Sequence, residues 1–283
     1  MHSFPRTVVG GISLPRMLIG SNWVLGYSHT GPAADAMIRQ RFSQREAVTA
    51  LIEAYLAYDI DAMMAPFAGK DVLLDGIHAA EDRTGKKVTL IDTPILDLSD
   101  SAEGRANARK VIEEGSKLGS DFCLIHHSSV EKLVSKMHGT MDRLPDYLDM
   151  IRQAGMIPGL SAHMPELIVY SDQNGYDVET YIQLYNCMGF LMQIENVHKI
   201  IWNARKPVMT IKSMAAGRVS PFVGLTFSFA TLRPCDMVTV GAHTPQEVHE
   251  DVEIAMAALD RRRPELEGRS SPNQTILTGA DAK

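Results

Sequence analysis

A short stretch near the middle of the chain limits the possible fold more than any other. Its apolar residues 122–125 run without a break into His126 and His127. An unbroken apolar run of this length predicts a strand buried on both faces, as found in parallel sheets. Such a strand delivers polar side chains to the carboxyl edge of its sheet, where α/β proteins place their chemistry. The stretch therefore predicts an α/β protein whose functional residues lie at strand ends.

The same arrangement recurs along the chain, with segments of helical spacing between the apolar runs. The last helical segment begins at Thr244 with a capping box that places proline at the first helical position. Four further apolar runs lead to Asp92, His163, Lys212 and His243. In all we expect strands over residues 14–20, 60–65, 88–92, 121–127, 156–161, 181–185, 208–212 and 236–241.

Strands that alternate with helices in this number favour a closed (β/α)8 barrel, the TIM barrel, over an open sheet. A doubly wound open sheet usually has fewer strands and a glycine-rich phosphate turn after the first one. Here Gly20 is followed by serine, asparagine and tryptophan, which is no such turn. We expect one barrel domain over residues 1–262 and a polar tail over residues 263–283.

The composition of the chain argues against some classes of binding partner. The formal net charge of −6 and the pI near 5.9 argue against a nucleic-acid binder, which needs a basic face for phosphate. The cysteines lie in or beside apolar runs without close pairing, which suits a reducing compartment. The first residues lack the apolar core of a signal peptide, and no apolar run approaches transmembrane length. We therefore expect a cytoplasmic protein that acts on a small molecule, away from membranes, and we leave a homo-oligomer open.

Several motifs in this order resemble the aldo-keto reductases. Residues 124–126 resemble the fourth strand of that family, which ends in a catalytic histidine, here His126. Residues 158–163 resemble its fifth strand and residues 182–186 its sixth. The resemblance implies a (β/α)8 barrel that binds NADP or NAD. It also implies that the cofactor is contacted by Ser161, Gln183, Asn186 and the helix start at Thr244.

The sequence departs from the remaining catalytic residues of that family. The family's strand-two aspartate could be Asp61, but its acid tyrosine falls where this chain has Pro66 and Phe67. Neither of these side chains can donate a proton. The family's lysine, which lowers the pKa of the tyrosine, falls at Asp92. The usual hydride-transfer machinery is therefore not expected.

The strand ends offer another arrangement. Asp92, His126 and His163 end consecutive strands, and neighbouring barrel strands lie about 5 Å apart, so these side chains could converge. One carboxylate with two imidazoles is a common ligand set for a divalent metal. Without a metal, His126 could simply form a hydrogen bond with the substrate. Lys212 could hold an anionic group, act as a base or form a Schiff base.

Further residues are expected to contact the substrate. Asn22, Trp23 and His29 form a candidate wall after the first strand, and tryptophan offers an apolar face to a sugar-like ring. His127, Asn186 and His243 are additional candidates at other strand ends. Our leading hypothesis is a barrel enzyme that acts on a polar carbonyl or polyol compound by acid–base chemistry, with or without a metal and without redox. Catalysis is assigned to His126, Asp92 and Lys212. A divergent NAD(P)H-dependent reductase and a non-catalytic ligand-binding barrel are the alternatives.

Overall fold

The computed structural model describes residues 3–266, and its centre is a closed barrel of eight parallel strands. Each strand pairs with the next one along the chain, and the last closes onto the first. This confirms the predicted (β/α)8 barrel. The strands are β3 (Met17–Gly20), β4 (Ala62–Ala65), β5 (Thr89–Asp92), β6 (Phe122–Ile125), β9 (Ile157–Ala162), β10 (Thr180–Leu184), β11 (Val208–Ile211) and β12 (Met237–Val240).

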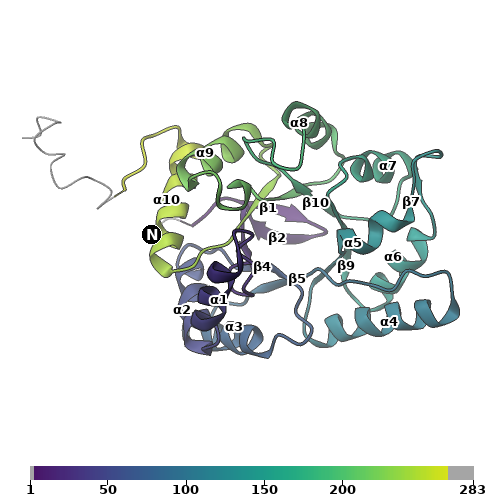
Figure 1. The fold of residues 1–283 in the computed structure, drawn as a ribbon, viewed down its shortest axis with the longest axis horizontal. Coiled ribbons are helices and arrows are strands. Elements are labelled where there is room, and N and C mark those ends of the chain that lie inside the picture. Colours follow the sequence, from purple (N-terminus) through teal and green to yellow (C-terminus); the bar gives the residue numbers. More distant parts are fainter. Residues whose placement is uncertain (1–2, 267–283) are drawn as a thin grey trace, which may run out of the picture.

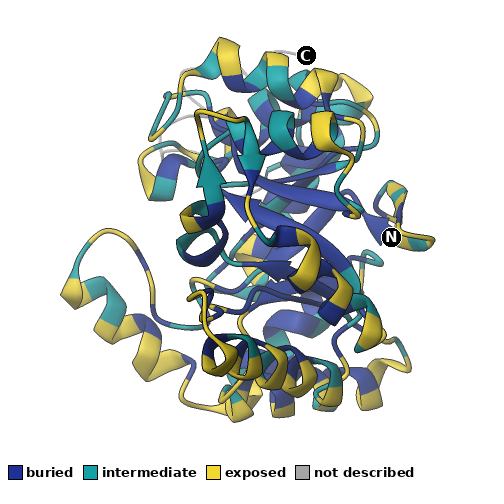
Figure 2. Ribbon diagram, turned by 90° about the vertical axis from the view of Figure 1, so that its right-hand side faces the viewer, coloured by how far each residue is buried: buried dark blue, intermediate teal, exposed yellow. Residues whose placement is uncertain are grey.

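Helices surround the barrel, as Figure 1 shows. Their apolar faces pack on the outer side of the strands, where the larger of two buried apolar clusters lies. The exposed residues gather on the outward faces of the helices in Figure 2. The helices are α1 (Pro32–Arg41), α2 (Arg45–Leu56), α3 (Asp71–Thr84), α4 (Ala102–Lys117), α6 (Leu144–Gln153), α7 (Glu166–Asn174), α8 (Ile194–Asn203), α9 (Pro221–Thr231) and α10 (Pro245–Asp260).

The direction in which each strand residue points follows from strand alternation. A second buried cluster, which includes Leu18, Ile91, Phe122, Leu124 and Ile182, fills the inside of the barrel. The neighbours of these residues along each strand pack outward against the helices. A residue two positions beyond an interior side chain therefore faces the barrel mouth, and a residue one position beyond it faces away.

A two-stranded antiparallel hairpin precedes the barrel, formed by β1 (Arg6–Val9) and β2 (Ile12–Pro15). Val9 and Leu14 of this hairpin belong to the interior cluster, so the hairpin covers the amino-terminal end of the barrel. We expected one strand over residues 14–20, but the structure divides it into β2 and β3. Arg16 separates them, because its buried guanidinium donates hydrogen bonds to the carbonyls of Arg233 and Asp236.

The segment between β6 and α6 is the one large departure from simple βα repeats. It holds the short helix α5 (His127–Val130), a 3-10 turn (Glu131–Leu133) and a small hairpin of β7 (Val134–Ser135) and β8 (Thr140–Met141). No helix within residues 3–266 is long and apolar enough to cross a membrane. Most of the predicted tail, residues 267–283, lies outside the described residues.

Candidate active site

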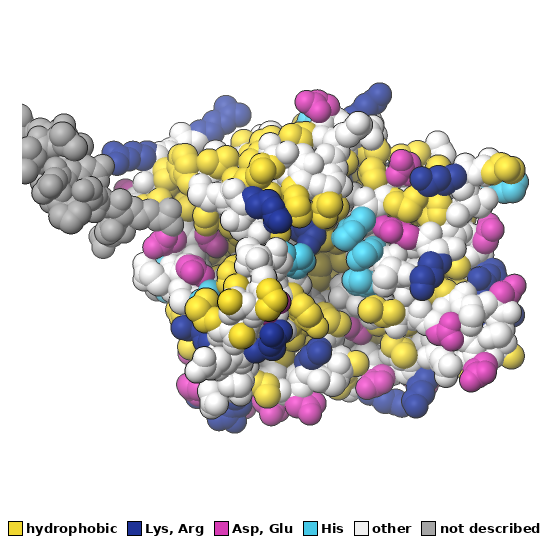
Figure 3. Space-filling view, in the orientation of Figure 1, with side chains coloured by type: hydrophobic (Ala, Val, Ile, Leu, Met, Phe, Trp, Pro, Cys, Tyr) yellow, Lys and Arg dark blue, Asp and Glu magenta, His cyan; other side chains and the backbone are white. Residues whose placement is uncertain are grey.

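A cavity of about 500 Å³ opens at the carboxyl ends of the barrel strands. Cavities of this size hold small molecules in many proteins. Figure 3 shows histidine side chains gathered beside a hollow on this face. The lining comes from the ends of the barrel strands and from the loops that follow them. Its residues with polar side chains are Ser21, Asn22, Trp23, Tyr27, Ser28, His29, Thr93, His126, His127, Ser161, His163, Lys212, Ser213 and Thr239.

The cavity brings together many of the residues expected from the sequence and leaves others out. The expected residues that line it are Asn22, Trp23, His29, His126, His127, Ser161, His163 and Lys212. The expected residues that do not line it are Asp92, Gln183, Asn186, His243 and Thr244. All of the first set except His29 stand within three residues of a strand end, and His29 comes from the long loop after β3.

Three histidines form a continuous cluster on one side of the cavity. The ring centroids of His126 and His127 lie 4.2 Å apart, and those of His127 and His163 lie 3.7 Å apart in a stacked arrangement. Glu131 holds the backbone that carries the third ring, because its carboxylate accepts hydrogen bonds from the backbone N–H groups of His163 and Met164 at 2.6 and 3.1 Å. The same residue lies 4.0 Å from Nδ1 of His127 through its second oxygen.

The tautomer of His126 follows from its neighbours. The backbone N–H of Ser128 donates to Nδ1 of His126 at 3.3 Å, and the Ser128 hydroxyl lies 2.8 Å from the same atom. A ring nitrogen that accepts a backbone N–H carries no proton of its own. Neutral His126 therefore holds its proton on Nε2, which makes this atom a hydrogen-bond donor.

The cluster is uncharged at neutral pH. Burial, followed by the nearby His127, lowers the pKa of His126 to about 4. Burial, followed by the positive charges of its neighbours, lowers the pKa of His163 to about 4 as well. The pKa of His127 is also lowered, again chiefly by burial. Packing three imidazoles together in a partly dry site thus favours their neutral forms.

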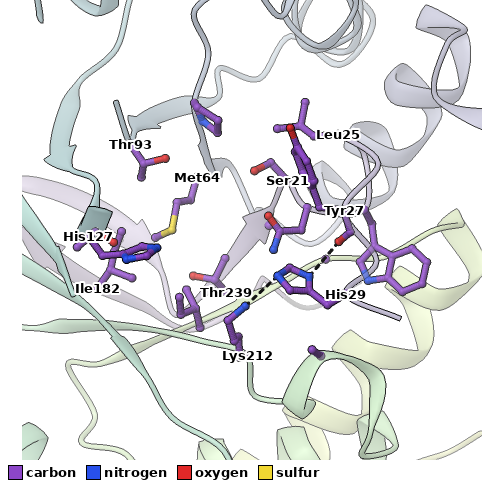
Figure 4. Close-up of a pocket in the computed structure, with 18 of the residues that line it drawn as sticks. Ser21, Leu25, Tyr27, His29, Met64, Thr93, His127, Ile182, Lys212 and Thr239 are labelled. Atoms are coloured by element: carbon purple, nitrogen blue, oxygen red, sulfur yellow. Dashed lines mark hydrogen bonds between the residues drawn. The ribbon is translucent and has the colours of Figure 1, made fainter. Parts of the chain in front are cut away.

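Lys212 enters the cavity from the end of β11, beside His29 (Figure 4). Its Nζ lies 3.1 Å from Nε2 of His29, and Nδ1 of His29 lies 3.2 Å from the carbonyl oxygen of Tyr27. Burial, followed by the charge of Arg218, lowers the pKa of Lys212. No Asp or Glu of the described chain lines the cavity, so the lining offers this ammonium no carboxylate.

Asp92 is placed differently from what the sequence suggested. Ile91 points into the barrel, so strand alternation turns Asp92 outward toward α4. There its carboxylate packs against Gly115 and accepts a hydrogen bond from the backbone N–H of Phe67 at 3.3 Å. Burial raises its pKa to about 6. The predicted metal set of Asp92, His126 and His163 is therefore wrong, and residues 3–266 contain no group of three or more His, Cys, Asp or Glu that could hold a metal.

Gln183 and Asn186 do not reach the cavity either. Ile182 lines the cavity, so the neighbouring Gln183 faces outward, where its amide is fully buried without a hydrogen-bond partner among the described residues. Asn186 is also fully buried, and its side chain accepts the backbone N–H groups of Met188 and Phe190. Asn186 therefore holds the loop after β10 and is not free to bind a ligand.

Side chains of the same segment already cap the start of α10. The hydroxyl of Thr244 accepts the backbone N–H of Glu247, as the capping box predicted. The carboxylate of Glu247 in turn accepts the backbone N–H of His243 at 2.6 Å. An acidic group thus already stands where a cofactor phosphate would use the helix start. The ring of His243 packs between Trp23 and Phe42, with its Nε2 buried and without a hydrogen-bond partner within residues 3–266.

Several lining residues were not anticipated from the sequence. Tyr27, Thr93, Ser213 and Thr239 all line the cavity. The hydroxyls of Ser213 and Thr239 are buried without a hydrogen-bond partner among the described residues, so they can bind a polar ligand. The only available signal was their place at or beyond a strand end, which many serines and threonines share.

The residues that correspond to the reductase catalytic set do not assemble. Pro66 lines the cavity at the place expected for the acid tyrosine, and Phe67 beside it is fully buried. Asp61 precedes β4 at the opposite end of the barrel, where it forms an ion pair with Arg6 at 3.0 Å. Of that set, His126 and Pro66 line the cavity, and only His126 brings a side chain that can take part in proton transfer. The expected nicotinamide contacts do not fit together here, because only Ser161 among them lines the cavity.

No known family model and no curated protein matches the sequence. Solved structures do match. A protein of Pseudomonas aeruginosa assigned to the aldo-keto reductases aligns with a TM-score of 0.66 and 15% identity, over 91% of this chain and 97% of that one. The chain has the aldo-keto reductase fold. An aldo-keto reductase of Klebsiella pneumoniae solved with NADPH aligns with a TM-score of 0.59 and 14% identity, over 95% and 98% of the two chains.

The likeness of the barrel extends beyond reductases. A truncated 3-deoxy-D-arabino-heptulosonate 7-phosphate synthase of Thermotoga maritima aligns with a TM-score of 0.54 and 12% identity, over 92% of this chain and 93% of that one. At such identities the comparisons establish the barrel and its connectivity. The chemistry must be argued from the side chains at the barrel mouth.

Proposed function

We propose that this chain is an enzyme that binds a small carbonyl or polyol compound in the barrel mouth and transfers a proton next to the carbonyl group. The observation that carries the proposal is His126, which is neutral near pH 7 and holds its proton on Nε2 at the edge of the cavity. A neutral imidazole that donates to a carbonyl oxygen stabilises the negative charge that develops there when a neighbouring proton is removed.

The rest of the lining is consistent with such a substrate. Trp23 offers an apolar face, and the unpartnered hydroxyls of Ser213 and Thr239 can bind substrate hydroxyls. The described lining contains no carboxylate, so an oxyanion meets no repulsion from a fixed negative charge. We therefore place the reaction among non-redox conversions that pass through an enolate, such as isomerisation or elimination.

Exchange of carbon-bound hydrogen in D2O tests the proposal directly. Pyruvate, dihydroxyacetone and hydroxyacetone would be incubated with the protein, and loss of the α-proton signals would be followed by NMR. We expect catalysed exchange of at least one compound, and a decrease of about 10²–10⁴-fold in His126→Gln. His138→Gln is the matched control, because His138 pairs with Ser135 on the β7–β8 hairpin and does not line the cavity. Equal rates in the His126 and His138 variants would refute the proposal.

The second candidate is reduction of a carbonyl compound with NAD(P)H. The comparisons favour it, because an aldo-keto reductase with this fold was solved with NADPH. The side chains favour it less, since the expected contacts of Gln183, Asn186 and Thr244 do not reach the cavity. Titration of the protein with NADPH and NADH decides between the two, with Trp23 as the reporter. Trp202→Phe removes the other tryptophan, which lies exposed on α8.

A further inference from the structure

We infer that Lys212 is a nucleophile that forms an imine with the carbonyl carbon of the substrate. The inference rests on the proposed function, because it requires a carbonyl compound in the same cavity. Lys212 is the only lysine in the described lining. Lys212 and His127 both project into this cavity in Figure 4, and His126 lines it too, so the cavity presents a nitrogen nucleophile and a hydrogen-bond donor to a carbonyl group.

A hydrogen-bonded chain prepares Lys212 for this role. Nδ1 of His29 can only donate to the carbonyl oxygen of Tyr27, because that oxygen has no proton to give. Nε2 of the neutral ring is then an acceptor, and it lies 3.1 Å from Nζ of Lys212. A nucleophile within reach of a base, with the base oriented by a third group, is the arrangement that covalent catalysis uses.

The backbone conformation of His29 and Lys212 also supports a functional role for this pair. His29 has φ +60° and Lys212 has φ +61°, both in the left-handed region. For residues other than glycine this conformation costs about 1–2 kcal/mol each. Such conformations persist where the surrounding structure imposes them, and they concentrate at functional sites. Two separate loops thus adopt unfavourable backbone geometry at the residues whose side chains meet.

The electrostatic surroundings favour the neutral amine that a nucleophile needs. Lys212 is partly buried, and no carboxylate of the described lining balances its charge. Burial, followed by the charge of Arg218, lowers the pKa of Lys212, and burial, followed by the charge of Lys212, lowers the pKa of His29. Both groups are therefore held toward their uncharged forms.

The covalent step balances without any further reactant. The lone pair of Nζ attacks the carbonyl carbon, a C–N bond forms, and the C–O π bond opens. The carbonyl oxygen receives one proton released from nitrogen through His29, which gives a carbinolamine. The proton that Lys212 released when its ammonium became the free amine returns to the hydroxyl, which leaves as water. The nitrogen lone pair then forms the C=N bond, and the nitrogen keeps its second proton. The protonated imine then withdraws electrons from the neighbouring carbon, which eases removal of its proton.

Reductive trapping tests the inference. The protein would be incubated with pyruvate or dihydroxyacetone and sodium cyanoborohydride, then digested and mapped by mass spectrometry. We expect the secondary-amine adduct on Lys212 to form at least about tenfold faster than on Lys206, the internal control. Lys206 lies outside this cavity and pairs with Glu179 at 2.9 Å. His29→Gln should slow trapping at Lys212 about tenfold or more, because it removes the base.

Two variants separate this inference from the proposed function. Lys212→Arg keeps the positive charge and cannot form an imine, and Lys206→Arg is its matched control. Loss of both adduct and α-proton exchange in Lys212→Arg alone supports the imine. Equal trapping of Lys212 and Lys206 in the unmodified protein overturns it, and this result needs no variant to fold. His126-dependent exchange that persists in Lys212→Arg overturns the imine and leaves the proposed function standing.

Discussion

The imidazole rings of His127 and His163 stack with their centroids 3.7 Å apart and their planes inclined by 17°. Two positively charged rings would repel each other strongly at this distance, so the contact disfavours protonation of both rings. The two residues come from different strand ends, the first after β6 and the second after β9. Their contact therefore exists only in the folded chain, and it couples the folding equilibrium to pH.

The first prediction concerns this coupling. In the unfolded chain His163 titrates near its ordinary pKa of about 6.5, whereas in the folded chain its pKa is about 4. Below pH 6.5 His163 binds a proton in the unfolded state but not in the folded state. This residue therefore makes the free energy of unfolding decrease as the pH falls toward 4. Urea unfolding of the original protein and of His163→Gln at pH 7, 5.5 and 4.5 measures it.

We expect the stability of the original protein relative to His163→Gln to decrease steadily over that pH range. Asp92 titrates in the opposite sense, because its pKa is raised to about 6, but it is present in both proteins and cancels in the comparison. NMR titration of the His163 ring provides the control. A midpoint near 6.5 for that ring would contradict the stacked, neutral cluster.

The second prediction is that chelators leave the protein unchanged. The histidine cluster faces a cavity whose described lining has no carboxylate, and Asp92 points away from it. We therefore expect the melting temperature of protein purified without a histidine tag to be the same before and after dialysis against EDTA. A decrease of several degrees that added Zn²⁺ or Mn²⁺ restores would show a metal site and refute the geometry described here.

The third prediction concerns the contact between Asp92 and Gly115 of α4. A Cβ added at Gly115 would lie 2.6 Å from Oδ2 of Asp92, which is closer than side-chain atoms tolerate. Gly115→Ala in a helix normally stabilises by up to about 1 kcal/mol. Here we expect it to destabilise by about 1–3 kcal/mol through overpacking. Urea unfolding of Gly115→Ala, Asp92→Ala and the double variant measures the coupling.

Removing the Asp92 carboxylate should relieve the clash, so the cost of Gly115→Ala should be smaller in the Asp92→Ala background. Asp92→Ala alone should also destabilise, because it leaves the buried N–H of Phe67 without its acceptor. Additive effects of the two changes would mean that Asp92 does not face α4.

The order of strands and helices could be predicted from the sequence, because buried parallel strands are apolar runs and the helices between them carry apolar residues at regular spacing. The hairpin of β1 and β2 was missed, since residues 14–20 were predicted as one strand and the break at Arg16 depends on carbonyls more than 200 residues away. Helix α1 was missed because its only large apolar side chains are Met37 and Ile38, of which Ile38 alone is buried, so no apolar stripe marks the helix.

The prediction of the candidate site succeeded only for residues whose direction did not depend on a shift of one position along the strand. His126 and His163 each follow their strand by one position, and alternation turns them into the cavity. Asp92 and Gln183 differ from interior residues by a single position, which places them on the outer face. The sequence shows where a strand ends but not which of its last residues points inward, because that register is set by packing of the whole barrel.

The fourth prediction uses two adjacent glycines in the turn between β1 and β2. Gly10 has φ +55° and Gly11 has φ +89°, so both occupy conformations that cost other residues about 1–2 kcal/mol. A Cβ on Gly11 would meet no atom within 4 Å, whereas a Cβ on Gly10 would lie 2.8 Å from Cγ2 of Ile157 on β9. We therefore expect Gly10→Ala to destabilise more than Gly11→Ala, by about 1–3 kcal/mol of additional overpacking. Urea unfolding measures the difference.

Both substitutions lie at the covered end of the barrel, so α-proton exchange and imine trapping should keep their original rates. Equal destabilisation by the two variants would show that the hairpin does not pack against β9.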